Sequence, residues 1–207
     1  MKIHLNATDM ETNMGVFKTA LTTAALALAA TASFGQEFKT DQGHTEVFFG
    51  WSHAGVSRQN GEFTKAEGTL VLDAGNLEAS TLRVVIDADS LSSGFGPLDD
   101  HLKAADFLDV ATYPEITFVS TAINQTSDTT ADVTGDLTIH GVTQPVVLAT
   151  TLTHQGEHPL GGVLDYYKGE WLGFSATAEI DHTAFNVGPF NTGPITIDIN
   201  TEMKAVE

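Results

Sequence analysis

Residues 101–121 read HLKAADFLDVATYPEITFVST and contain two periodicities separated by Pro114. Before the proline, apolar residues from Leu102 to Leu108 recur at roughly helical spacing, behind the acidic pair Asp99–Asp100, which suits a helix start. Proline cannot continue a helix, and after it apolar and polar residues alternate from Ile116 to Thr121. The stretch therefore predicts a short helix followed by a strand.

Bulk composition places the chain among soluble globular proteins. It has 207 residues, of which 42% are hydrophobic and 17% are charged, so a packed core is expected. Cysteine is absent, which excludes disulfides, thiolate metal sites, a cysteine nucleophile and a cysteine-linked lipid anchor. The net charge of −18 repels nucleic acid and anionic membrane surfaces, so neither is expected as a partner.

The N-terminal segment has the composition of a secretory signal peptide. Lys18 precedes an apolar run, Ala20–Ala30, that is too short to span a bilayer and is followed by small residues suited to cleavage. The acidic residues before Met14 do not suit such a signal, which predicts that translation starts at Met14. We expect residues 1–35 to form the signal peptide and residues 36–207 to form one exported, periplasmic domain with no stable membrane insertion.

The rest of the chain alternates between apolar and polar residues in short runs separated by turn residues. Residues 55–61 are predicted as a turn region and residues 154–168 as a loop. Few helical segments intervene, so successive strands should pair antiparallel, and eight strands can close into a barrel. The eight predicted strands contain residues 45–53, 63–72, 82–87, 116–121, 133–139, 146–152, 174–180 and 195–203, with the short helix between strands three and four.

Several ordered motifs across residues 36–207 are similar to those of the YceI-like family of bacterial periplasmic proteins. They are His44, Trp51-Ser52-His53, Gly61-Glu62-Phe63, residues 101–107, residues 113–118 and residues 135–146. The resemblance implies a lipocalin-like, eight-stranded antiparallel barrel that binds a polyisoprenoid or a similar long-chain amphiphile in its pore. The family often has a basic residue followed by Asp-Phe-Gly near the C-terminus, where this chain has His182 and then Thr-Ala-Phe-Asn.

The apolar faces of the predicted strands and helix supply the candidate ligand-binding residues. Side chains on these faces can fill a small barrel or line a channel, and small residues at Gly135, Ala176 and Ala178 favour a channel. Burying a methylene contributes about 0.8 kcal/mol and association costs roughly 4–15 kcal/mol, so a long prenyl or acyl chain is favoured over a short acid. The candidate pore-lining residues are Val47, Phe49, Trp51, His53, Phe63, Leu70, Val84, Ile86, Phe107, Phe118, Leu137, Ile139, Leu148, Phe174, Ile180, Ile197 and Ile199.

Other candidate sites are weaker. His53 could contact a ligand head group or simply bond to the backbone. His154 and His158 have a zinc-like separation and could be joined by His44 or His182, but they lie in a Gly-rich segment without a recognisable metal motif. No nucleophile elbow, phosphate-binding loop or spaced carboxylate pair occurs, so the sequence predicts no catalytic set, no metal and no cofactor.

The predicted function is a periplasmic carrier that shields an isoprenoid or acyl lipid, without catalysis. Two alternatives stay open: an enzyme acting on a lipid-like substrate with a quinone or metal, and a ligand-free stress-protective module, which requires a filled interior. The sequence also leaves a homodimer open. The predicted helix is expected to close one mouth of the barrel through Leu102, Phe107 and Leu108.

Overall fold

The computed structural model describes residues 35–207. The predicted signal peptide, its cleavage site and the predicted start at Met14 lie outside these residues. Within the described part of the chain, none of the helices has the length and apolar character needed to cross a membrane.

Strands make up most of the described chain. They are β1 (Gln36–His53), β2 (Ser57–Phe63), β3 (Ala66–Leu72), β4 (Thr81–Asp87), β5 (Leu91–Ser92), β6 (Glu115–Gln125), β7 (Thr130–Ile139), β8 (Val142–Glu157), β9 (Glu170–Ile180) and β10 (Ile195–Ala205). The α-helix α1 (Gly96–Lys103) lies between β5 and β6, and short 3-10 helices occupy Leu77–Ala79, Ala88–Ser90, Asp165–Tyr167 and His182–Phe185.

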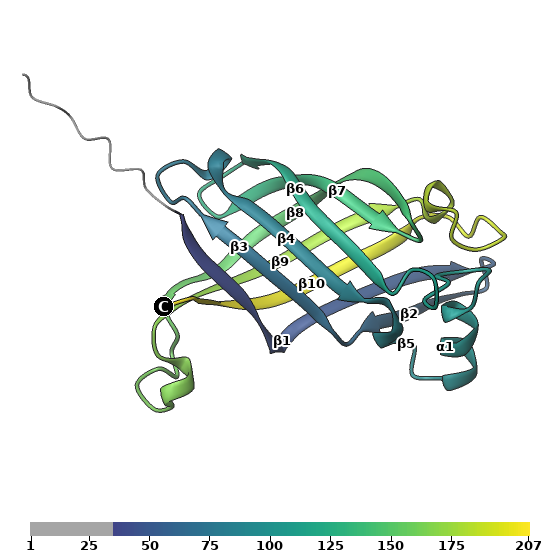
Figure 1. Ribbon diagram of the computed structural model, residues 1–207, viewed down its shortest axis with the longest axis horizontal. Helices are drawn as coiled ribbons and strands as arrows, with labels where there is room; N and C mark the ends of the chain where they lie inside the picture. The colour runs from purple at the N-terminus through teal and green to yellow at the C-terminus, as the bar shows by residue number, and fades with distance from the viewer. Residues whose placement is uncertain (1–34) are drawn as a thin grey trace, which may run out of the picture. The chain divides into compact units, whose positions relative to one another are not determined.

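Eight of these strands form a closed antiparallel barrel (Figure 1). The ring runs β1, β3, β4, β6, β7, β8, β9 and β10, and β10 pairs with β1 to complete it. β2 pairs with the second half of β1, and β5 adds to β2, so these two strands lie outside the ring. The predicted eight-stranded antiparallel barrel is confirmed.

The first strand is longer than predicted and bends. Its pairing with β10 shifts in register between Thr40 and Thr45, so its first half pairs with β3 and its second half with β2. The prediction of a turn over residues 55–61 was wrong for most of that range, because positive φ angles at Ala54 and Gly55 reverse the chain at once and β2 starts at Ser57.

The helix starts and ends earlier than predicted. Pro97 lies in its first turn, where the missing N–H costs nothing, and the Asp99 carboxylate accepts a 2.7 Å hydrogen bond from the Ser93 amide. The helix ends at Lys103, and the chain folds back so that the amide of Leu108 donates to the carbonyl of Leu102. Phe107 and Leu108 therefore lie in the turn after α1, not on it.

Burial alternates along the strands as a barrel wall requires. In β8 every second residue from Val142 to Leu152 is half-buried and its neighbours are exposed. Then the β8–β9 register shifts between Leu152 and His154, and β8 continues to Glu157. The prediction that residues 154–157 belong to a loop was therefore wrong.

Two aromatic rings lie against glycines of a neighbouring strand. A Cβ at Gly61 would lie 2.5 Å from the Phe49 ring, and a Cβ at Gly135 would collide with the Phe118 ring and lie 2.7 Å from the Val119 carbonyl oxygen. The space over Gly135 is thus occupied by Phe118, so the expectation that Gly135 leaves room for a ligand was wrong.

We predict that Gly135→Ala lowers the free energy of unfolding by about 1–3 kcal/mol, the usual cost of overpacking. The new methyl group cannot be accommodated by side-chain movement alone, because the Val119 carbonyl is part of the backbone. Denaturant unfolding measures the change. Gly162→Ala is the matched control, since nothing lies within 4 Å of a Cβ there. Equal midpoints for the two variants would contradict this account.

Candidate functional site

The barrel encloses a cavity of about 1000 Å³ that runs along its length. Its lining extends from Ser127 and Thr129, in the β6–β7 turn, to Leu98 and Leu102 on α1 and Phe190 in the loop before β10. All seventeen candidate residues from the sequence line it, including His53, Phe107 and those contributed by every strand of the ring.

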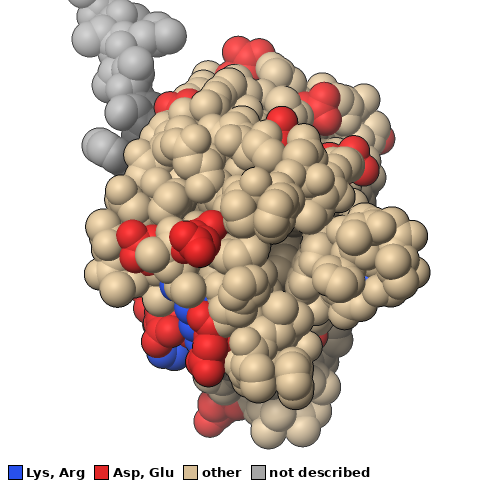
Figure 2. Space-filling view, turned by 90° about the vertical axis from the view of Figure 1, so that its right-hand side faces the viewer, with Lys and Arg blue, Asp and Glu red and all other residues tan. Residues whose placement is uncertain are grey.

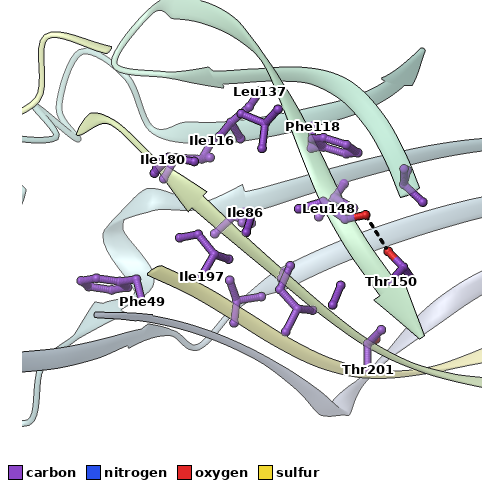
Figure 3. Close-up of a pocket in the computed structure, with 18 of the residues that line it drawn as sticks. Phe49, Ile86, Ile116, Phe118, Leu137, Leu148, Thr150, Ile180, Ile197 and Thr201 are labelled. Carbon is purple, nitrogen blue, oxygen red and sulfur yellow. Dashed lines mark hydrogen bonds between the residues drawn. The ribbon is translucent and has the colours of Figure 1, made fainter. Parts of the chain in front are cut away.

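The middle of the cavity is walled by aliphatic and aromatic side chains. Figure 3 shows Ile86, Phe118, Leu137, Leu148 and Ile197 directed toward a shared space from five different strands. Closure of the barrel turns one face of each strand inward, so alternation along separate segments of sequence produces one continuous apolar wall.

The hydroxyl groups in this wall bond to the protein itself. Thr150 Oγ1 donates to the Leu148 carbonyl at 3.3 Å (Figure 3), and the hydroxyls of Thr45 and Thr201 lie 2.8 Å apart. Thr40 Oγ1 accepts a hydrogen bond from the Gly68 amide. Because these groups already have partners, the middle of the cavity suits hydrocarbon rather than a polar group.

Aromatic and polar side chains meet at the end of the cavity near α1. The Phe49 ring lies 5.7 Å from the Trp51 ring and 5.2 Å from the Phe63 ring. His53 and His101 also line this end, and neither imidazole hydrogen-bonds to another described residue. This end therefore combines apolar surface with free polar groups.

The turn after α1 is joined to the 186–194 loop. The Gly188 amide donates to the Asp106 carbonyl at 3.1 Å, and a Cβ at Gly188 would lie 3.2 Å from the Phe107 ring. Phe107 also packs on the His101 ring, with centroids 4.6 Å apart. Figure 2 shows that this end of the molecule is mostly uncharged, with acidic side chains toward its periphery.

His182 is a structural residue in this loop. It is 7% exposed, its Nδ1 donates to the Val187 carbonyl at 2.6 Å, and its Nε2 accepts from the Thr192 amide at 3.2 Å. Accepting at Nε2 requires the neutral imidazole. His182 therefore fixes the loop at the mouth of the cavity and has no nitrogen free for a charged head group.

Several lining residues were missed at the sequence level. Ile116 and Val146 lie on faces whose alternation was evident, so the same pattern that found their neighbours could have found them. Phe185, Pro189 and Phe190 come from the segment between β9 and β10, which has no periodicity, and no local signal identifies them.

A second group of polar residues lies on the outer face of the barrel. His44, His154, His158 and Glu202 line a smaller pocket of about 360 Å³. The structure brings His44 to the His154–His158 pair, but His182 lines the main cavity instead.

Comparisons with known proteins agree with this architecture. The model of the YceI-like domain matches residues 38–205. A UPF0312 protein from Pseudomonas putida strain W619 is 40% identical over 192 residues, covering 91% of this chain and 93% of the relative. The structure of BcnA from Burkholderia cenocepacia aligns with a TM-score of 0.68 at 24% identity, covering 79% of this chain and 98% of BcnA. A polyisoprenoid binding domain from Saccharophagus degradans aligns with a TM-score of 0.61 at 12% identity, covering 82% and 98% of the two chains.

We predict that Phe107→Ala accelerates hydrogen exchange at the Gly188 amide, because the ring shields the bond from that amide to Asp106. Exchange resolved by residue, by NMR or mass spectrometry, measures the effect. Amides in the middle of β9 should keep their protection, and Asp100→Ala, an exposed change on α1, should leave Gly188 unchanged. Unaltered exchange at Gly188 in Phe107→Ala would show that the ring does not hold these two segments together.

Proposed function

The chain belongs to the YceI-like family, and on that premise we propose that it binds a polyisoprenoid or similar long-chain amphiphile inside the barrel and carries it through the periplasm. The observation that carries the proposal is the cavity of about 1000 Å³, whose middle offers hydrocarbon walls and hydroxyls that already have partners. The description of the Saccharophagus degradans neighbour as a polyisoprenoid binding domain supports the ligand class.

The energetics favour a long chain over a short one. Each buried methylene contributes about 0.8 kcal/mol, and association costs roughly 4–15 kcal/mol, so on the order of a dozen carbons must be buried to offset that cost. A cavity that spans the barrel from the β6–β7 turn to α1 provides apolar wall along its length. A chain shielded in this way would cross water inside an acidic protein, without chemistry at the ligand.

The polar end of the ligand is assigned to the α1 mouth. His53 and His101 line that mouth with imidazoles that have no hydrogen-bond partner among residues 35–207, and Gln59 also lines the cavity. Imidazole can donate to or accept from an alcohol, a carbonyl or a carboxylate. The turn after α1 and the 186–194 loop would then close over the bound chain. The close approach of the Phe107 ring to Gly188 would hold these two segments together as a lid.

The two alternative functions have less support. A ligand-free stress-protective module requires a filled interior, whereas the side chains leave a cavity of about 1000 Å³. An enzyme needs a reactive set of side chains inside the cavity, and the described lining offers isolated histidines rather than a nucleophile with its base.

We predict that a long-chain fatty acid brominated in mid-chain quenches the fluorescence of Trp51, because Trp51 lines the cavity and the other tryptophan, Trp171, does not. Delipidated protein is titrated with the acid while emission is recorded. Quenching should persist in Trp171→Phe and disappear in Trp51→Phe. Quenching that is equal in the two variants would place the acyl chain outside the cavity.

We predict that Ala178→Phe weakens binding of the same acid about tenfold or more. Ala178 lines the cavity, and displacing two methylenes from it costs about 1.6 kcal/mol, slightly over the 1.4 kcal/mol of a tenfold change. Its neighbour Thr177 is exposed on the same strand, so Thr177→Phe is the matched control and should bind normally. Equal affinities for both variants, measured by direct titration, would argue against a ligand in the barrel.

A further inference from the structure

Three exposed apolar side chains lie at the α1 end of the barrel and form what we call the apolar rim. Val56 is 84% exposed, Phe95 63% and Phe190 76%. Val56 lies in the turn between β1 and β2, Phe95 directly before α1, and Phe190 in the loop before β10, and these three segments are at the same end of the barrel (Figure 1). Phe190 lines the cavity, and His53 and Leu98, three residues from Val56 and Phe95 respectively, line it too. The apolar rim is therefore at the α1 mouth of the cavity.

Glycine turns hold two of these side chains out in solvent. Gly55 and Gly94, which directly precede Val56 and Phe95, have φ angles of 75° and 79°. Residues with a side chain rarely adopt such angles, so glycine makes these tight reversals possible. A Cβ at either glycine would have nothing within 4 Å, so no other part of residues 35–207 packs over these turns. Val56 and Phe95 therefore project from the tips of their loops.

The apolar rim is continuous with the interior of the barrel. Phe190 lines the cavity although most of its side chain is exposed, so one ring belongs to both surfaces. Leu98 lies one helical turn after Phe95 and faces the cavity. An apolar path thus leads from the outside of the molecule into the cavity. Exposed apolar side chains that are grouped in this way mark interaction sites.

A second group of exposed apolar residues differs from the rim in this respect. Leu160, Val163, Leu164 and Tyr166 lie between β8 and β9, and Val163 is 79% exposed. Their segment is at the opposite end of the barrel from α1 (Figure 1), and none of the four residues lines the cavity. Val163 therefore serves as a control for Val56, with the same side chain and similar exposure but no connection to the interior.

Charge limits the kind of surface that the rim can meet. Figure 2 shows uncharged side chains over most of this end, with acidic side chains toward its periphery. Asp99 and Asp100 lie on α1, and the whole chain has a net charge of −18, which opposes an anionic surface. Arg58, exposed at the start of β2, donates to the Thr196 hydroxyl and keeps further N–H groups for a phosphate. This pattern suits head groups that contain phosphate but have no net charge.

The form of the rim favours lipid over a protein partner. Its three side chains come from three separate segments at the mouth of the cavity, so they do not make one continuous face. An aromatic side chain buries about 150–250 Å², so two rings and one valine fall short of the roughly 800 Å² that each partner of a standard protein complex contributes. Fluid lipid can surround separate side chains, and phenylalanine is among the residues that peripheral proteins insert below the head groups.

We propose that the apolar rim docks transiently on a zwitterionic lipid surface and presents the α1 mouth to it. Val56, Phe95 and Phe190 insert among the head groups, and a lipid passes between the surface and the barrel without crossing water. Attachment through only three side chains keeps the contact reversible. The inference rests on the proposed function for its purpose, but docking itself needs no ligand in the cavity.

The chain has no cysteine, so a single label can be placed at either end of the barrel. Val56→Cys and Val163→Cys are each labelled with a fluorophore that responds to polarity and are mixed with phosphatidylcholine vesicles. The label at position 56 should emit more strongly and at shorter wavelength, and the label at position 163 should not change. Replacing phosphatidylcholine with phosphatidylglycerol should weaken the response, and added salt should restore part of it by screening the repulsion.

An unlabelled double variant, Val56→Ser with Phe95→Ser, tests the side chains themselves. Neither residue lines the cavity, and serine suits the N-cap position that Phe95 occupies, so the fold should be kept. Binding to phosphatidylcholine vesicles, measured by flotation, should fall about tenfold, or about 1.4 kcal/mol, which is within the gain from burying one apolar side chain. Val163→Ser should bind as the parent does. The brominated fatty acid should still quench Trp51 in both variants.

The proposal is overturned if the label at position 56 does not respond to phosphatidylcholine vesicles, if both labels respond equally, or if anionic vesicles give the stronger response. A label at position 56 that responds to a periplasmic protein fraction but not to vesicles would assign the rim to a protein partner, which also overturns it. Absence of Trp51 quenching in the parent chain would instead contradict the proposed function and leave the vesicle result standing, so the two failures are distinguishable.

Discussion

The pairing of β10 with β1 is the interaction on which the rest of the structure depends. It joins the last strand of the chain to the first and closes eight strands into a ring. Closure removes the unpaired edges of the sheet and divides every strand into an inner and an outer face. Ile199 and Asn200 illustrate the result, because these adjacent residues of β10 line the cavity and the outer pocket respectively.

The bend in β1 is a second constraint, and it follows from the first. One strand of eighteen residues must pair with β10 along its length, with β3 at its start and with β2 at its end. The register shift between Thr40 and Thr45 allows this change of partner. It also leaves Asp41 and His44 in an irregular segment, where their side chains can meet each other and approach Glu202.

Strand alternation carried most of what could be predicted from sequence. It is a local signal with a period of two, so the inward residues of each strand could be assigned without knowing how the strands pair. The signal fails where the backbone departs from regular geometry. Positive φ at Ala54 makes the turn before β2 shorter than predicted. In β8 the pairing with β9 shifts in register after Leu152 and then continues, so His154 lies on a strand and not in the predicted loop. The outer pocket that His44, His154 and Glu202 line depends on pairing across β1, β10, β9 and β8, which no local pattern encodes.

The chemistry of the cavity wall limits how a ligand can be selected. An apolar wall distinguishes chains that differ by one methylene by only about 1–3 kcal/mol of binding free energy. The hydroxyls of Thr45, Thr150 and Thr201 already bond to other protein groups, so they add no polar contacts to a ligand. Under the proposed function, selection in the middle of the barrel would therefore depend on the length and width of the chain. Finer discrimination needs polar side chains that are free to form hydrogen bonds with the ligand. At the α1 end, His53 and His101 line the cavity and have imidazoles without a hydrogen-bond partner among the described residues, so under the proposed function the head group would be recognised there and the chain in the barrel.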